Sequence, residues 1–257
     1  MAERVYPSVI RTVLGLFRVF DFKFTIDGEE NIPQLGGAVL ASNHVSYLDF
    51  TFVGLAAYPK RRYVRFMAKQ AVFDNKVAGP LMRGMHHIPV DRSAGAAAYS
   101  SAVTALRDGE LVGVFPESTI SRAFVPRTLK TGAARMALEA EVPLIPVVVW
   151  GGQRIWTTGR KPKLRRHVPI VITVGAPIEV TGEESAAALT AVLHDRLTKL
   201  AEEVQSAYPA PAPGEETWWQ PAFLGGTAPT LEAAAPIEAA AIEARKNRKR
   251  RGRRPQA

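Results

Sequence analysis

Residues 41–50 read ASNHVSYLDF and place a histidine and an aspartate, His44 and Asp49, five positions apart. A histidine can take a proton from a hydroxyl at neutral pH, and a carboxylate that holds one ring nitrogen leaves the other free to accept that proton. Two side chains five residues apart on a regular helix point about 140° apart, so this pair can meet only across a turn. The sequence predicts such a turn, because a strand-like run ends near Asn43 and Ser46 is a good N-cap for a following helix.

The same stretch also admits a purely structural interpretation. Ser46 and Asp49 have the spacing of a capping box at the start of a helix predicted over 47–58, with Asp in place of the usual Glu. A carboxylate in a first helical turn also suits the helix dipole. Spacing alone therefore leaves two alternatives open, a catalytic pair and a helix cap.

Several other catalytic classes lack their motifs in this chain. The sequence contains no GxSxG elbow, no GxxxxGK[ST] loop, no GxGxxG fingerprint and no HExxH pair. It has no cysteine, which excludes disulfides, thiolate nucleophiles and thiolate metal sites. His86 and His87 are adjacent and point in different directions along an extended segment, without a carboxylate cluster nearby in the sequence. We therefore expect no metal.

Four motifs in order resemble those of the glycerolipid acyltransferases, the family of 1-acylglycerol-3-phosphate acyltransferases. NHVSYLD (43–49) resembles the NHxxxxD signature, and GMHHIPVDR (84–92) resembles the second motif, which ends in an arginine. VFPESTISR (114–122) resembles the third, usually written FPEGTRS, and VPLIPV (142–147) is similar to the fourth. The resemblance covers about residues 30–180 and favours the catalytic interpretation of the first motif.

The resemblance implies a direct acyl transfer and a role for each motif. His44 is the implied general base for a glycerol hydroxyl that attacks the thioester of acyl-CoA or acyl-carrier protein, and Asp49 orients its ring. No acyl-enzyme and no cofactor is implied. Arg92 is the implied phosphate ligand, since a guanidinium can bind phosphate oxygens bidentately. Lys69 and Glu117 are further implied substrate-binding residues.

The third motif departs from the family pattern at two positions. Ser118 replaces the usual glycine and Ile120 replaces the usual arginine. Because isoleucine cannot pair with phosphate, either Arg122 provides the charge or the headgroup is held differently, and Lys130 is another cation that could face the site. The expected acceptor is 1-acylglycerol-3-phosphate. The alternatives are glycerol-3-phosphate, another lysophospholipid and a glycolipid.

Strand-like apolar runs alternate with helical patterns along most of the chain. Strands are expected over 20–28, 38–42, 63–68, 87–90, 111–115, 144–150 and 168–174, and helices over 96–108, 131–141 and 183–208. This alternation predicts an α/β fold with a largely parallel central sheet flanked by helices, whose ligands bind at the carboxyl ends of the strands. We assign residues 25–208 to the acyltransferase domain.

The two ends of the chain differ from this central part. Residues 1–24 predict an amphipathic helix with a basic stripe, which could pack on the core or lie in a membrane interface. The resemblance favours the interface, because a lysophospholipid is presented at a bilayer surface. Residues 209–257 are rich in Pro, Ala and Gly and are predicted to form a disordered tail with a basic end at 245–254.

The positive charge bears on the partners. The formal net charge is +9, and a basic chain suits a polyanion, whether a phosphorylated small molecule, nucleic acid or an anionic membrane. Residues 151–167 hold six Lys or Arg, one Trp and no acid, which fits either a solvated loop or a contact with the nucleotide of coenzyme A or with lipid headgroups. A nucleic-acid-binding protein is the rival class. It predicts salt-dependent binding that is lost without 245–254, but it does not explain the four motifs.

Location follows from the same features. Apolar runs fall short of the roughly 20 residues that a bilayer requires, and Arg11 and Arg18 interrupt any signal-peptide core. We therefore expect a peripheral protein on the cytoplasmic side of the cell membrane. The expected partners are a lysophospholipid, the acyl donor and an anionic membrane surface, and no nucleic acid.

Overall fold

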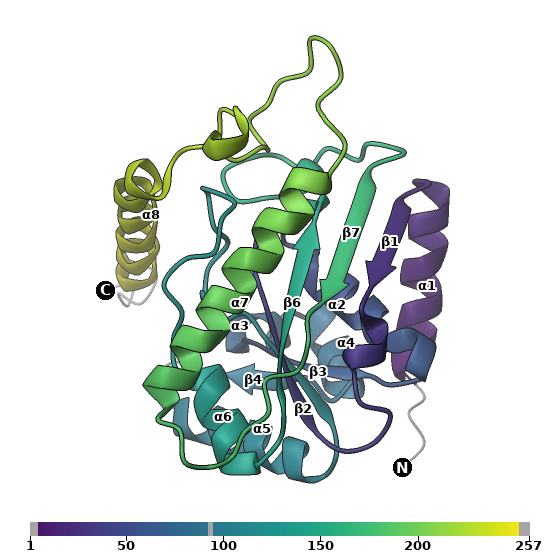
Figure 1. The fold of residues 1–257 in the computed structure, drawn as a ribbon, viewed down its shortest axis with the longest axis vertical. Helices are drawn as coiled ribbons and strands as arrows, with labels where there is room; N and C mark the ends of the chain where they lie inside the picture. The colour runs from purple at the N-terminus through teal and green to yellow at the C-terminus, as the bar shows by residue number, and fades with distance from the viewer. Residues whose placement is uncertain (1–4, 92–94, 252–257) are drawn as a thin grey trace, which may run out of the picture.

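The computed structural model describes the backbone of residues 5–91 and 95–251, and the side chains of these residues except 242 and 245–251. This part of the chain forms one seven-stranded sheet with helices on both faces (Figure 1). The strand order is β1-β7-β6-β2-β5-β3-β4. The strands are β1 Lys23–Asp27, β2 Ala38–Ser42, β3 Val64–Lys69, β4 Ile88–Val90, β5 Leu111–Val114, β6 Leu144–Trp150 and β7 Pro169–Val174.

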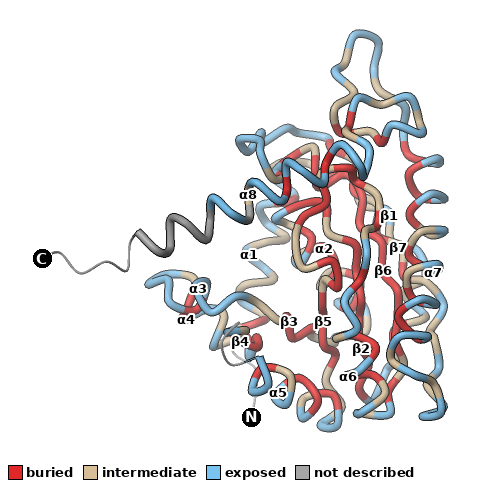
Figure 2. Tube along the Cα trace, turned by 90° about the vertical axis from the view of Figure 1, so that its left-hand side faces the viewer, coloured by how far each residue is buried: buried red, intermediate tan, exposed pale blue. Residues whose placement is uncertain are grey.

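The predicted α/β fold is confirmed, and each predicted strand is present. Of the neighbouring strand pairs in the described residues, β6 with β7 is antiparallel and the others are parallel. Every residue of β2, β5 and β6 is buried, and these strands lie in the red interior of Figure 2. Strands covered on both faces lack polar alternation, which explains the continuous apolar runs of the sequence.

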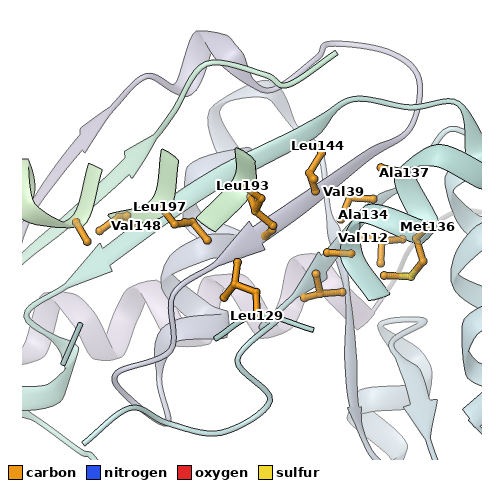
Figure 3. Close-up of a cluster of buried hydrophobic side chains, with 14 of the residues drawn as sticks. Val39, Val112, Leu129, Ala134, Met136, Ala137, Leu144, Val148, Leu193 and Leu197 are labelled. Carbon is orange, nitrogen blue, oxygen red and sulfur yellow. The ribbon is translucent and has the colours of Figure 1, made fainter. Parts of the chain in front are cut away.

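The helices divide between the two faces. Their bounds are α1 Val5–Val19, α2 Asp49–Ala57, α3 Gln70–Phe73, α4 Ala78–Gly84, α5 Gly95–Arg107, α6 Gly132–Ala140, α7 Ala186–Ala207 and α8 Leu231–Arg251. Helices α5, α6 and α7 cover one face, where Val39 and Val148 meet Ala134 and Leu193 (Figure 3). Helices α1 and α2 cover the other face, where Phe17 and Phe52 pack together. Successive side chains of β2 point to opposite faces of the sheet, so neighbouring residues of this strand pack into the two separate cores.

Helix α1 is packed on the protein along one side and exposed along the other. The hydroxyl of Tyr6 donates to the Val64 carbonyl at 2.8 Å, and Phe17 is buried. Arg11 and Arg18 of the predicted basic stripe are exposed. No described helix combines the length and the apolar character that crossing a bilayer demands.

The segment after α7 corrects the prediction of a disordered tail. Figure 1 shows the chain running from α7 across the top of the molecule to α8, which lies on the opposite side from α1. Trp219 is only 2% exposed, and the Arg154 guanidinium lies 4.4 Å from its ring centroid. Glu238 of α8 pairs with Arg127 at 2.7 Å. The prediction of disorder was therefore wrong for residues 209–238. It was based on the Pro, Ala and Gly content, whereas the tryptophans of this segment bury a large apolar area.

Candidate active site

His44 and Asp49 meet on the turn between β2 and α2, at the carboxyl end of a central strand. Nδ1 of His44 lies 3.0 Å from Oδ2 of Asp49. The Asp49 side chain is fully buried, whereas that of His44 is 20% exposed. A carboxylate bonded at Nδ1 selects the tautomer that leaves Nε2 as a proton acceptor. The predicted pair therefore has the geometry of a base and its orienting carboxylate.

Asp49 also closes the turn, although not as a capping box. Its Oδ2 accepts the backbone N–H groups of Val45 at 2.7 Å and Ser46 at 2.8 Å. Ser46 is not the N-cap, since α2 begins at Asp49 with Leu48 before it and has no side-chain cap bond. The Ser46 hydroxyl instead accepts the Leu48 N–H at 3.1 Å and donates to the Trp156 carbonyl at 2.7 Å. The predicted helix start was wrong because these bonds stabilise an extra turn before the helix.

Asn43 anchors the turn to the neighbouring strand. The backbone pairing of β2 with β6 ends at Ser42 opposite Val147. Beyond it, the Asn43 amide donates to the Val149 carbonyl at 3.0 Å and accepts the Val149 N–H at 2.8 Å. The Asn43 side chain thus takes the place of a neighbouring strand for β6, while the backbone after β2 turns away from the sheet. Sequence reasoning included Asn43 in a motif without finding this role, because its partner is 106 residues away.

Glu117 lies in the loop after β5 and contacts the backbone of the base. Its Oε1 accepts the His44 N–H at 3.0 Å, and the Ser121 N–H donates to the His44 carbonyl at 2.8 Å. The ring of Phe115 stacks on the His44 ring with centroids 4.3 Å apart. Residues of the third motif thus hold both the backbone and the ring of His44. A direct contact between Glu117 and substrate stays a prediction.

Both carboxyl groups of the site are shielded from water. Burial raises the pKa of Glu117 to about 8, against the opposing effects of the His44 N–H and the Arg127 charge. Burial also raises the pKa of Asp49, and the bond to His44 opposes this. Perturbed carboxyl groups beside a histidine are typical of functional sites.

Of the two predicted phosphate ligands, Lys69 is placed by the structure. Lys69 is the last residue of β3 and pairs in register with Val90 at the end of β4. Arg92 follows β4 by two residues and lies outside the described residues. Since the carboxyl ends of parallel strands share one edge, Lys69 lies on the side of β2 toward β3 and β4.

The other predicted cations are placed differently. The Arg122 guanidinium lies against Gly159, where an added Cβ would be 2.5 Å from Nη1. Arg122 therefore faces the loop that follows β6, on the other side of the base from β3. Lys130 is exposed, and its backbone N–H donates to the Pro116 carbonyl at 3.1 Å. Ile120 is buried, so it packs inside the loop.

Three contacts around the site involve residues that no sequence motif indicated. Thr157, in the loop after β6, donates its hydroxyl to the Val45 carbonyl at 2.7 Å. Arg127 donates to the Thr119 hydroxyl at 2.8 Å, beside the third motif. Glu238 of α8 pairs with Arg127. No local pattern signals these contacts, because each partner is chosen by the tertiary fold.

The adjacent histidines are not ligands of a metal cluster in the described residues. Nδ1 of His87 accepts the Phe66 N–H at 3.1 Å. Burial, together with the Arg65 charge, lowers the pKa of His87 to about 4, so it is neutral at pH 7. No group of three or more His, Asp or Glu side chains able to hold a metal ion occurs in the described part of the chain.

Comparisons with known proteins agree with this geometry. Residues 23–150 match the family model described as Acyltransferase. The chain is 29% identical over 200 residues to the 1-acyl-sn-glycerol-3-phosphate acyltransferase of Bacillus subtilis, covering 75% of this chain and 92% of the relative. It is 26% identical to the enzyme of that name from Borreliella burgdorferi, covering 71% and 73%.

A solved structure shares the fold. The crystal structure of the 1-acyl-sn-glycerophosphate acyltransferase PlsC from Thermotoga maritima superposes with a TM-score of 0.64 at 21% identity, covering 79% of this chain and 82% of that one. The mostly parallel sheet and its flanking helices are therefore an architecture known from this group of enzymes. The motifs, the geometry of the site and the family match agree. The chain therefore belongs to the acyltransferase family, and the protein is an acyltransferase.

Proposed function

We propose that the protein transfers a fatty acyl group from acyl-CoA or acyl-carrier protein to the free hydroxyl of 1-acylglycerol-3-phosphate, forming phosphatidate. The 3.0 Å contact between His44 and Asp49 carries the proposal. The curated relatives from Bacillus subtilis and Borreliella burgdorferi bear the name of this activity. The finer assignments of acceptor and donor rest on the placement of the charges around the base.

The reaction follows from the roles of two side chains. Nε2 of His44 takes the proton of the acceptor hydroxyl as its oxygen attacks the thioester carbonyl, and Asp49 stabilises the imidazolium that forms. Collapse of the tetrahedral intermediate expels the thiolate, which takes the proton from Nε2. The products are phosphatidate and a free thiol. Proton transfer to and from His44 balances without a metal or a cofactor.

Positive charge on one side of the base suits the acceptor phosphate. Lys69 is the last residue of β3, and Arg92 comes two residues after β4 in the sequence; both are the expected phosphate ligands. A guanidinium binds two phosphate oxygens at once, whereas an ammonium acts as a compact point charge. The acceptor would thus be held with its phosphate toward β3 and β4 and its hydroxyl at His44.

Apolar surface beside the base suits an acyl chain. The rings of Tyr47 and Trp156 lie with centroids 4.8 Å apart and are 38% and 40% exposed. Phe50, one residue into α2 after Asp49, is 39% exposed. Exposed aromatic side chains with a polar handle are favoured where apolar and aqueous phases meet. These rings would contact the acyl chains of the substrates.

The location that we propose is peripheral, on an anionic membrane surface. Leu16 and Val19 of α1 are 52% and 65% exposed, with Arg11 and Arg18 exposed on the same helix. Apolar side chains flanked by arginines suit the headgroup region of a bilayer. Because α1 is also packed on the sheet, it would bring the site close to the lipid without inserting deeply.

Mass-resolved product analysis tests the function. Purified protein is incubated with acyl-CoA or acyl-carrier protein and a panel of 1-acylglycerol-3-phosphate, other lysophospholipids, glycerol-3-phosphate and a glycolipid. The expected product is phosphatidate, and His44→Ala should lower its rate by roughly 100- to 10,000-fold. His194→Ala, a histidine on α7, is the matched control and should keep the wild-type rate. Full activity of His44→Ala would exclude the mechanism.

A related acyltransferase activity on another acceptor is the second candidate. Ile120 occupies the position of the family arginine, and it is buried in the loop after β5. Arg122 does not take its place beside Lys69, since it faces Gly159. The buried Ile120 at the position of the family arginine therefore favours an acceptor with a different headgroup. Faster turnover of such an acceptor in the same panel would select this alternative.

A further inference from the structure

A second group of cations surrounds a pocket in the loop that follows β6. The pocket has a volume of about 270 Å³. Arg154, Arg160, Lys161 and Lys163 line it, with Trp218 from the segment after α7. None of the described side chains that line the pocket carries a carboxylate. Such a cavity is suited to an anion.

Most of this positive charge is not neutralised within the described residues. Arg154 is paired, because its guanidinium contacts Glu215 at 2.6 Å. Arg160 lies 3.9 Å from the ring centroid of Trp218, a cation–π contact that leaves its N–H donors available. The ammonium groups of Lys161 and Lys163 make no ion pair in the part of the chain that the structure describes. Among the residues described, the pocket therefore presents three cations without a partner carboxylate.

The pocket adjoins the catalytic turn. Thr157, one of its lining residues, is bonded to the Val45 carbonyl directly after His44. Gly159, another lining residue, contacts the Arg122 guanidinium of the third motif. A ligand fragment bound here lies next to the base on the side of β6.

Sheet order separates this pocket from the proposed acceptor site. In the order β6-β2-β5-β3-β4, His44 follows β2, and the pocket loop follows the adjacent strand β6. Lys69 ends β3, which lies two strands from β2 on the other side. Because neighbouring strands lie about 4.8 Å apart, the cations of the pocket and the cation at the end of β3 lie on opposite sides of the base. Two separate sites suit a reaction between two phosphorylated substrates.

We propose that the pocket binds the phosphates of a coenzyme A thioester, which makes acyl-CoA the donor; this rests on the proposed function. The pocket is smaller than the roughly 300–1,000 Å³ of sites that enclose a whole small molecule. It fits a phosphate fragment, with the pantetheine arm leading to His44 and the adenosine at the rim near Trp218. Arg122 joins this donor side, which explains why it does not take the place of Ile120.

The segment after α7 completes the site. Trp218 contacts Phe124 of the third-motif loop, with ring centroids 6.3 Å apart, and stacks with Arg160. Its neighbour Trp219 is buried in the core. The tail thus forms one wall of the donor pocket.

Calorimetric titration of the full chain with coenzyme A, and with adenosine 3′,5′-bisphosphate as the smaller probe, tests the proposal. Lys161→Ala/Lys163→Ala should raise the Kd of coenzyme A and the KM of acyl-CoA at least about tenfold, with kcat unchanged. Arg196→Ala/Lys199→Ala on the exposed side of α7 removes the same charge and should leave both constants unchanged. Trp218→Ala should weaken binding of the smaller probe.

The outcomes separate the donor site from the proposed function. Unchanged coenzyme A affinity in Lys161→Ala/Lys163→Ala would overturn the donor site, as would a rise in KM confined to the lysophospholipid acceptor. Use of acyl-carrier protein alone, without coenzyme A binding, would also overturn it. Coenzyme A binding that depends on the pocket, without turnover of 1-acylglycerol-3-phosphate, would support the donor site and reject the proposed acceptor.

Discussion

One carboxylate oxygen, Oδ2 of Asp49, lies 3.0 Å from Nδ1 of His44 and also accepts the N–H groups of Val45 and Ser46. The ring and the backbone that carries it are therefore held by the same atom. The Asp49 side chain therefore has two functions: it pairs with His44, and it holds the backbone at the start of the helix. This double use explains why spacing alone could not decide between them.

Asp49→Asn should reduce catalysis without unfolding the protein. An amide oxygen can still accept the Val45 and Ser46 N–H groups, but it has no charge to stabilise a protonated His44. We expect kcat to fall at least about tenfold.

The melting temperature separates this effect from a structural one. Burial of the charged Asp49 side chain opposes folding, so Asp49→Asn should melt no lower than wild type. Asp195→Asn, whose side chain is 87% exposed, is the control and should change neither quantity. A wild-type kcat in Asp49→Asn would show that the carboxylate acts only on the backbone.

Asn43→Ala should destabilise the fold through the strand β6. Both backbone groups of Val149 would lose their partner inside the sheet, at about 1–3 kcal/mol each. A melting temperature lower by roughly 4–24 °C follows for a chain of this size. Asn75→Ala, which removes exposed bonds to Val77 and Ala78, should cost less because water replaces them. Equal losses in the two variants would contradict the anchoring role.

Local patterns predicted most of the architecture. Apolar runs such as 144–150 are long enough, and sufficiently rich in β-branched residues, to identify central strands without tertiary information. Helical spacing likewise located α5, α6 and α7 to within three residues at each end. The pairing of His44 with Asp49 was within reach because both lie on one turn.

Long-range contacts set the remaining features. The start of α2 depends on Trp156, whose carbonyl accepts a bond from the Ser46 hydroxyl 110 residues away. Arg122 is turned toward Gly159 by the packing of a loop that the sequence places far away. The composition predicted a disordered tail. Burial of one indole, that of Trp219, stabilises the segment despite its many residues of low hydropathy. The wrong helix start and the wrong prediction of disorder both arose where a distant partner overrode a local preference.

Glu117 should make stability fall as pH rises from about 4.5 to about 8. Its pKa in the folded protein is raised to about 8 from an ordinary 4.5, so the folded state binds more protons than the unfolded state in this window. The stabilisation is complete below the unfolded pKa and is lost as pH passes through the folded one. Relative to Glu117→Gln, wild type should lose up to about 1.4 kcal/mol per pH unit.

Urea unfolding at pH 5, 6.5 and 8 measures the difference. Glu117→Gln keeps an oxygen that accepts the His44 N–H, so its fold should be retained. Glu216→Gln, at an exposed position, should follow the wild-type pH dependence. Parallel pH curves for wild type and Glu117→Gln would rule out a buried, proton-binding carboxyl at this position.

Trp219→Ala should show that the segment after α7 is part of the folded domain. The side chain is 2% exposed and contacts Tyr208 and the Arg154 guanidinium, so its removal leaves a large cavity. The expected cost is about 3–5 kcal/mol, or a melting temperature lower by about 6–20 °C. Phe223→Ala, 54% exposed in the same segment, should cost little. If Trp219→Ala melted like wild type, the segment would be dispensable for the fold, and the wall of the pocket at Trp218 would lose its support.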